Sequence, residues 1–328
     1  MDSDYETTKR RLEDQKLVLR AWRQRLPQTD YILSDAFDYL HPPWTRDTGP
    51  LTIEPATECL GSLDILPLEV LNYVILGLDI ASLSTMQCVN RRAKLIVDSV
   101  PQLRTLASLP SCRAVVRGII LIGATHVDLG TLYATLCDRY CVVCGKFGGY
   151  IYLITCRRVC YHCFTSNDLF LPMLGKQACT MTGRARKNLK DLPHIRSLTG
   201  QYSRSGKICP TELTLWDRAA VVAIQTAKPH WEKKDGKECN PRRFMAIVDA
   251  PWIKHPSKVA QWSGRYCLGC PLDTIDPELS CRKQYTDEEY EDHIERYGNV
   301  VIWEGPQNSR QPTHRSLLDA TAAALSSG

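Results

Sequence analysis

The stretch that decides the fold begins Leu63-Asp64-Ile65-Leu66-Pro67-Leu68-Glu69-Val70-Leu71 and continues as helix-forming sequence to position 101. Pro67 suits the first position of a helix, because its missing N–H costs no hydrogen bond there and its φ is already set. After this proline, apolar residues recur at helical spacing and predict a single apolar face, made of Val70, Leu71, Val74, Ile75 and Leu78.

Two further short helices are predicted in the same stretch. Asp79 suits the N-cap of a helix that holds Leu83, and Asn90 suits the N-cap of a helix that holds Ile96 and ends at Pro101. A bundle of three such short helices can bury little of its own apolar surface. We therefore expect an apolar flank that another polypeptide covers.

This stretch resembles the F-box, a helical module that binds the Skp adaptor of cullin-RING ubiquitin ligases. The resemblance rests on the following motifs: Leu66-Pro67-x-Glu69-x-Leu71, Ile75, Leu78-Asp79, Ser82-Leu83 and the turn Val89-Asn90-Arg91-Arg92. It implies a substrate receptor, which docks on the ligase core and presents a protein whose identity the sequence does not show. Docking would pack apolar helix surfaces against a helical groove. The residues expected to contact the adaptor are Leu66, Pro67, Leu68, Leu71 and Ile75.

Length and composition indicate an ordinary globular protein. The chain has 328 residues, of which 44% are hydrophobic and 23% charged, and this allows two compact domains with tails. A net charge of +5 is small for this length and does not demand a nucleic-acid or membrane partner. The most apolar stretches, 70–83 and 115–127, are too short for a membrane span and are interrupted by Asp79 and Arg117.

The cysteine content is more informative. The polar opening Met1-Asp2-Ser3-Asp4-Tyr5-Glu6 is followed by no apolar signal region, so we expect an intracellular protein of the cytoplasm or nucleus. In a reducing compartment, paired cysteines serve as metal ligands more often than as disulfides. The odd number of cysteines, fifteen, also argues against a complete disulfide framework.

A first zinc site is predicted from two Cys-x-x-Cys knuckles. Cys141 and Cys144 form one knuckle, and Cys160 and Cys163 form the other after fifteen intervening residues. Together the knuckles can supply four thiolates to one tetrahedral Zn²⁺. Cys156 and His162 are spare candidates. We expect Cys156 to be a reduced structural cysteine, and the side chain of His162, inside a knuckle, to point away from the site. A closed site of four thiolates leaves no position for water, which favours a structural role over metal catalysis.

A second zinc site is left open by the sequence. Cys267 and Cys270 form a third knuckle, and His293 lies on a helix opened by the capping-box pattern Thr286-Asp287-Glu288-Glu289. These three residues leave one ligand to find. Cys281 is the nearest soft donor, and His255 is an alternative. An ordinary buried cysteine at position 281, with no second metal, also remains open.

The order of these motifs is similar to a group of filamentous-fungal F-box proteins with cysteine-rich C-terminal regions. The similarity covers about residues 60–305 and includes Tyr152-Leu153, Arg158-Val159-Cys160-Tyr161-x-Cys163-Phe164, Leu192-Pro193 and Tyr266-Cys267-x-Gly269-Cys270. In that group a cysteine follows the helical histidine by four positions. Here Tyr297 stands at that position, and tyrosine is a poor zinc ligand.

Other functions find less support in the sequence. The chain has no Gly-rich phosphate loop and no Gly-x-Ser-x-Gly elbow, and the gap between Cys163 and Cys267 does not fit a cross-braced RING. We therefore expect a receptor without catalytic residues. A nucleic-acid-binding zinc ribbon is the main alternative, and a ligase-independent scaffold is another. The nucleic-acid reading rests on a basic cluster without interleaved aromatic residues: Arg184, Arg186, Lys187, Lys190, Arg196 and Lys207.

The predicted fold class is mainly α with small β elements. We expect an N-terminal arm and linker over 1–57, a three-helix F-box-like domain over 60–101, an irregular zinc-stapled region over 102–304, and a disordered tail over 305–328.

Overall fold

The computed structural model describes residues 31–33, 59–226, 240–255, 260–262, 264–271, 279–304 and 310–319. They form two compact units, one built mainly from the described residues between 31 and 262 and the other mainly from those between 264 and 319. The predicted arm and linker lie outside the described residues except at 31–33, where Ile32 and Leu33 are buried. The fold is mainly α with small β elements, as predicted.

The F-box-like stretch folds into four short elements. These are the 3-10 helix η3 (Gly61–Ile65) and the helices α2 (Leu68–Leu76), α3 (Ile80–Gln87) and α4 (Arg91–Ser99). Both predicted N-caps are confirmed. The Asp79 carboxylate accepts hydrogen bonds from the N–H groups of Ala81 and Ser82 in α3 at 3.0 and 2.9 Å, and the Asn90 amide oxygen accepts one from the N–H of Ala93 at 2.8 Å. The sequence predicts Pro67 at the first position of its helix. In the structure it is the N-cap of α2, so the helix begins one residue later, at Leu68.

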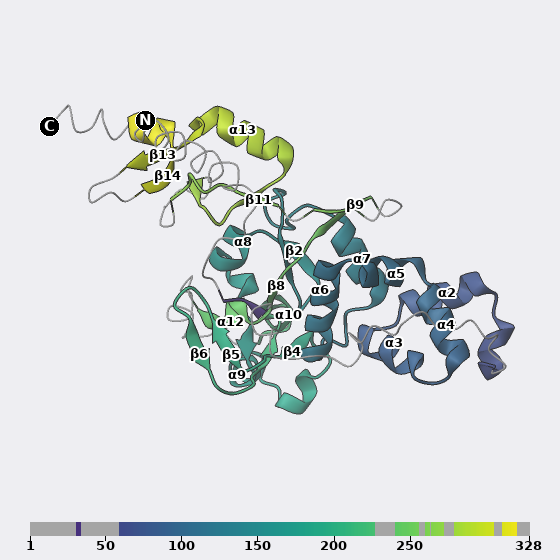
Figure 1. The fold of residues 1–328 in the computed structure, drawn as a ribbon. Helices are drawn as coiled ribbons and strands as arrows, with labels where there is room; N and C mark the ends of the chain where they lie inside the picture. Colours follow the sequence, from purple (N-terminus) through teal and green to yellow (C-terminus); the bar gives the residue numbers. More distant parts are fainter. Residues whose placement is uncertain are drawn as a thin grey trace. The chain divides into compact units, whose positions relative to one another are not determined.

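Three more helices follow, with a loop between the second and the third. They are α5 (Pro101–Ser108), α6 (Pro110–Leu121) and α7 (Leu129–Cys137). Helix α2 contacts α7, and α3 contacts α6, while the N–H of Leu129 donates to the Leu78 carbonyl at 3.0 Å. Figure 1 shows α5, α6 and α7 between α2–α4 and the first sheet of this unit. None of the helices in the described residues is long and apolar enough to cross a bilayer.

Short strands and helices complete the larger unit. One antiparallel sheet has β1 (Tyr150–Tyr152) between β2 (Arg157–Val159) and β8 (Ile247–Asp249), and another has β7 (Thr214–Trp216) between β3 (Met173–Leu174) and β4 (His194–Arg196). The remaining elements are two hairpins, β5 (Gly200–Tyr202) with β6 (Lys207–Cys209) and β9 (Trp252–His255) with β10 (Ala260–Trp262), and the helices α8 (Tyr161–Ser166), η4 (Asp168–Phe170), α9 (Gly175–Thr182), η5 (Arg186–Leu189), α10 (Arg218–Ala223) and α12 (Pro241–Phe244).

The described part of the smaller unit contains an eleven-residue helix, helical residues at 315–319 and two pairs of strands. Strand β11 (Arg265–Tyr266) pairs with β12 (Gln284–Tyr285), and β13 (Val300–Glu304) pairs with β14 (Arg310–His314) on the C-terminal side of helix α13 (Asp287–Tyr297). The predicted capping box of α13 is confirmed, with Thr286 as N-cap and Glu289 bonding back to it. The boundary predicted between the zinc-stapled region and the tail, at residue 304, falls between β13 and β14, inside their hairpin. Strand β14, Arg-Gln-Pro-Thr-His, lacks the apolar alternation by which a strand is recognised in sequence.

One buried cation ties the larger unit together. Arg158 on β2 is 1% exposed. Burial lowers the pKa of its guanidinium to about 10, although the nearby Asp138 carboxylate acts to raise it, so the group stays charged at neutral pH. Its three nitrogens donate to carbonyl oxygens from three separate segments: Thr135 (3.0 Å), Leu136 (3.5 Å), Gly148 (2.6 Å), Ala250 (3.4 Å) and Pro251 (2.8 Å). Removing this side chain would leave several buried acceptors without donors.

We predict that Arg158→Met lowers the free energy of unfolding by about 3 kcal/mol or more, since several buried carbonyls lose their donor at once. Chemical denaturation of the purified chain measures this. Arg157→Met is the matched control, because Arg157 precedes it on β2 but is exposed, and it should change stability by less than about 0.5 kcal/mol. Equal losses in the two variants would contradict the assigned role of Arg158.

Candidate docking surface and metal centres

Helix α2 divides its apolar side chains between two faces. Leu71 and Ile75 are 4% and 1% exposed and form part of the chain's own core. Leu68 is 52% exposed, Pro67 is exposed and Leu66 is half-buried. Of the five residues predicted to bind an adaptor, three therefore have surface available, while Leu71 and Ile75 hold the helix in place from within.

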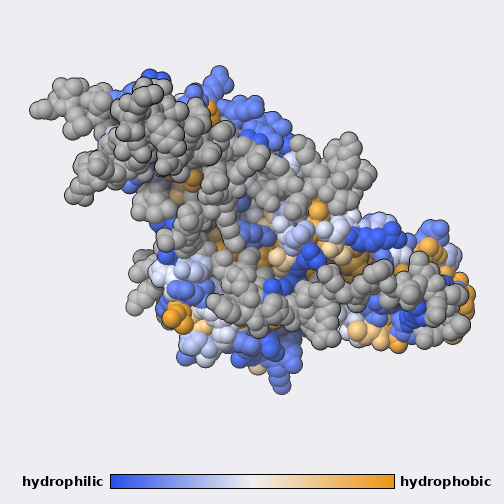
Figure 2. Space-filling model, viewed as in Figure 1, coloured by the Kyte–Doolittle hydropathy of each residue, from blue (hydrophilic) through white to orange (hydrophobic). Residues whose placement is uncertain are grey.

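Several large apolar residues of this region are exposed. They come from η3, α2 and the turn before α4, and they are Leu63, Ile65, Leu68, Val70, Tyr73, Val74 and Val89. Ile65 and Tyr73 leave about four-fifths of their surface in solvent, at 83% and 79%. Figure 2 shows apolar surface at the edge formed by η3 and α2. Exposed apolar residues grouped in this way mark an interaction surface more often than a free one.

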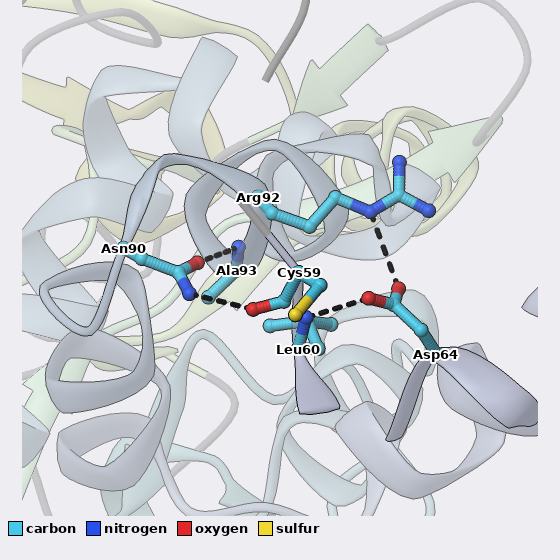
Figure 3. Close-up of polar contacts among 6 residues, drawn as sticks. All are labelled: Cys59, Leu60, Asp64, Asn90, Arg92 and Ala93. Atoms are coloured by element: carbon cyan, nitrogen blue, oxygen red, sulfur yellow. Dashed lines mark hydrogen bonds and ion pairs between the residues drawn. The ribbon is translucent and has the colours of Figure 1, made fainter. Parts of the chain in front are cut away.

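A polar network fixes the backbone beside this surface, and its members are Cys59, Leu60, Asp64, Asn90, Arg92 and Ala93 (Figure 3). Asn90 caps α4 with its amide oxygen and donates from its amide nitrogen to the Cys59 carbonyl at 3.1 Å. Asp64 accepts from the Leu60 N–H at 2.6 Å and pairs with Arg92 at 3.4 Å. The segment that presents Ile65 is thus joined to the start of α4.

The four cysteines of the two predicted knuckles come together. The sulfur atoms of Cys141, Cys144, Cys160 and Cys163 lie within 4.8 Å of one another. Cys141 and Cys163 are buried, Cys160 is half-buried and Cys144 is exposed. Four thiolates at this separation suit a tetrahedral Zn²⁺, so these residues could hold the metal as a structural site.

The backbone of the first knuckle explains this convergence. The N–H of Cys141 donates to the Lys146 carbonyl at 2.7 Å, and Gly145 turns back with φ of +69°, a conformation that favours glycine. A Cβ at Gly148 would lie 2.8 Å from the Arg158 side chain and 3.2 Å from the backbone N of Cys141. Arg158 and the knuckle thus approach each other closely only because position 148 has no side chain.

The two spare candidates near this site are not in the cluster. Cys156 is buried near Thr135, with 3.8 Å between Sγ and Oγ1, and burial raises the pKa of its thiol to about 11. It therefore stays protonated at neutral pH. His162 is exposed and is not among the four grouped side chains.

A second group of donors forms in the smaller unit. It joins three predicted residues, Cys267, Cys270 and His293, with His314. The ligand atoms of all four residues lie within 4.8 Å of one another. The fourth member differs from the sequence-based candidates. Cys281 is buried beside the group but is not one of the four, and the side chain of His255 lies outside the described part of the chain. Sequence reasoning missed His314 because it lies on β14, within the predicted tail.

The pKa values of these groups depend on one another, because the groups are buried in mutual contact. A hydrogen bond from Cys270, followed by bonds from the two imidazoles, lowers the pKa of Cys267 against the effect of burial. The pKa of Cys270 is raised, because its proton is held in the bond to Cys267 and because it is buried. Burial acts to lower the pKa of His314, but the neighbouring Cys267 raises it overall. A metal cation would replace this shared proton and favour both thiolates.

Two members of the basic cluster are engaged by the chain itself. Arg196 pairs with Glu212 at 3.3 Å, and Arg186 donates to Thr214 Oγ1 at 2.8 Å while its guanidinium lies 5.4 Å from the Trp216 ring centre. Trp216 is 2% exposed, so its ring offers no open face for stacking a base.

Comparison with known proteins identifies the helical module. The family model of the F-box domain matches residues 63–105, which include α2, α3 and α4. The chain therefore contains an F-box domain, a module that in general binds Skp-type adaptors and serves substrate receptors of SCF-type ligases. Neither the curated proteins nor the solved structures gave a match to the chain.

We predict that Cys144→Ala removes one zinc ion per chain relative to the wild-type protein, because the first cluster loses a thiolate. Cys144 is exposed, so this change opens no cavity. Elemental analysis of purified protein measures the effect. Cys88→Ala, an exposed cysteine outside both clusters, should leave the metal content unchanged. An unaltered zinc content in Cys144→Ala would argue against this ligand set.

Proposed function

We propose that this chain is a substrate-receptor subunit of an SCF-type cullin-RING ubiquitin ligase. The observation that supports it best is the apolar outer face of α2 and η3, which lies within the residues that match the F-box domain. Leu66, Pro67 and Leu68 would contact the Skp-type adaptor together with Ile65 and Tyr73. Leu71 and Ile75 would act indirectly, by holding α2 against the core.

The division of α2 into two faces supports a permanent docking role. Contacts of α2 with α7 and of α3 with α6 already cover the inner side of the module. The exposed apolar residues on the outer side therefore have no role in the core of the described chain. Covering them with a partner would recover the free energy of burial, at about 25 cal/mol per Å² of apolar surface.

The remainder of the chain would face the substrate. In this proposal the thiolate cluster of Cys141, Cys144, Cys160 and Cys163 binds Zn²⁺ as a structural staple, in the manner of zinc ribbons and of cysteine-rich fungal F-box proteins. The chain would perform no bond chemistry of its own. Holding a protein substrate near a charged ubiquitin carrier raises the effective concentration of the reacting groups, and this proximity would be its mechanism.

We predict that Leu68→Asp weakens binding of a Skp-type adaptor at least tenfold, or about 1.4 kcal/mol, because an unpaired charge enters an apolar contact. Leu68 is the first residue of α2, where an acidic side chain interacts favourably with the helix dipole, so the module itself should stay folded. Titration calorimetry with purified adaptor measures the change.

The control for this experiment is Ile208→Asp. Ile208 on β6 is 73% exposed, outside the F-box, so the substitution makes a similar surface change without touching the proposed contact. Adaptor affinity should be unchanged in this variant. Wild-type affinity in Leu68→Asp, with the fold confirmed by circular dichroism, would refute the docking proposal.

A further inference from the structure

The four donors of the smaller unit converge on a single point. His314 Nε2 lies 3.2 Å from Cys267 Sγ and 3.5 Å from Cys270 Sγ, and His293 Nε2 lies 3.3 Å from Cys270 Sγ. The two imidazole nitrogens are 3.0 Å apart. Tetrahedral zinc with bonds of about 2.3 Å to sulfur and about 2.0–2.1 Å to nitrogen requires donor separations of about 3.3–3.8 Å. The observed separations are close to that geometry.

The histidine that completes the set is held in the form that a metal needs. Nδ1 of His314 lies 2.8 Å from the Gly298 carbonyl oxygen, which can only accept, so Nδ1 carries the proton. In the neutral imidazole Nε2 then carries the lone pair, and this nitrogen is the one that faces the two sulfur atoms. A backbone carbonyl that fixes the tautomer of a ligating histidine is a common outer contact in zinc sites. Cys281 is not one of the four grouped donors.

The knuckle is shaped for a close approach to His314. A Cβ added at Gly269, between the two cysteines, would lie 2.7 Å from Val300 Cγ2 and 3.1 Å from His314 Cδ2. Only glycine therefore allows the knuckle to lie against the β13–β14 hairpin. The contact of Gly269 with Val300 on β13 and with His314 on β14 thus places the hairpin and the fourth donor, His314, together.

The apolar core that the described residues of this unit form is small. Its buried members are Cys267, Cys270, Cys281, Tyr285 and Val300, with Leu279, Tyr290 and Ile294 partly buried against them, so three of the five buried members are cysteines. The four described strands of this unit, β11, β12, β13 and β14, are short, from two to five residues each. Units with so small a core usually need a metal or disulfides to fold, and none of the described cysteines is in a disulfide.

We propose that Cys267, Cys270, His293 and His314 bind a structural Zn²⁺ ion on which the folding of the smaller unit depends. The knuckle, helix α13 and strand β14 would each supply ligands, and the metal would join the three. Removing it would leave two thiols and two imidazoles buried together with only the hydrogen bonds among themselves and to Gly298 in place of the metal bonds. This site is independent of the proposed adaptor docking, because it involves neither η3 nor α2.

The test uses the full-length chain and zinc itself. His314→Ala should lose one zinc per chain relative to wild type, whereas Cys281→Ala, altered in the same buried cluster, should lose none. Hydrogen exchange followed by mass spectrometry should show lost protection across 284–304 and 310–319 in His314→Ala, with α2–α4 unchanged. Adaptor binding should persist in this variant, so failure here and failure of the docking proposal are distinguishable.

A second measurement avoids the possibility that His314→Ala is insoluble. Wild-type protein stripped with a strong chelator should lose exchange protection in the same peptides and recover it when zinc alone is added. The proposal is overturned if His314→Ala keeps the wild-type zinc content, if Cys281→Ala loses a zinc ion, or if the stripped protein keeps its protection in α13 and β13–β14.

Discussion

The buried guanidinium of Arg158 is the constraint on which the larger unit depends. It brings the end of α7, the turn at Gly148 and the segment after β8 to one point by donating to their carbonyls. Its own carbonyl accepts from the N–H of Val142, inside the first knuckle. The same residue thus sets the sheet edge and the backbone of the thiolate cluster. A charge buried this deeply is stable only because its hydrogen-bonding groups are satisfied.

Helix α2 shows how a short module can serve two interfaces. Its inward residues, Leu71 and Ile75, are committed to the chain's own core, and its outward residues remain exposed. A helix that is apolar on both faces needs cover on both sides. The short F-box module alone can cover only one of them. The fusion to α6 and α7 therefore gives the module a fixed inner support. The polar network around Asp64 and Asn90 then orders the approach to the outer face.

Much of this architecture could be predicted from local sequence signals. The caps at Asp79 and Asn90, the box at Thr286, and the pairing of the knuckles through Cys141 and Cys160 depend on residues a few positions apart, or on well-known spacings. His314 could not be found in this way, because it lies 47 positions after Cys267 on a strand without apolar alternation. The division of α2 also escaped the sequence, because both faces are apolar and only tertiary packing decides which one is covered. Likewise, nothing local marks Arg158 as the buried member of the Arg157–Arg158 pair beyond strand alternation.

The wide spacing of the second donor set also has a consequence for synthesis. The donors belong to a knuckle, a helix and a strand that leave the ribosome in that order, with 47 positions between Cys267 and His314. At about 5–20 residues per second, the last imidazole follows the first thiol by about 2–9 s. During that interval Cys267, Cys270 and Cys281 are three nascent thiols with a single helical histidine. A metal ion bound by all three of these thiols, or a disulfide between two of them, would therefore form most readily before translation reaches His314.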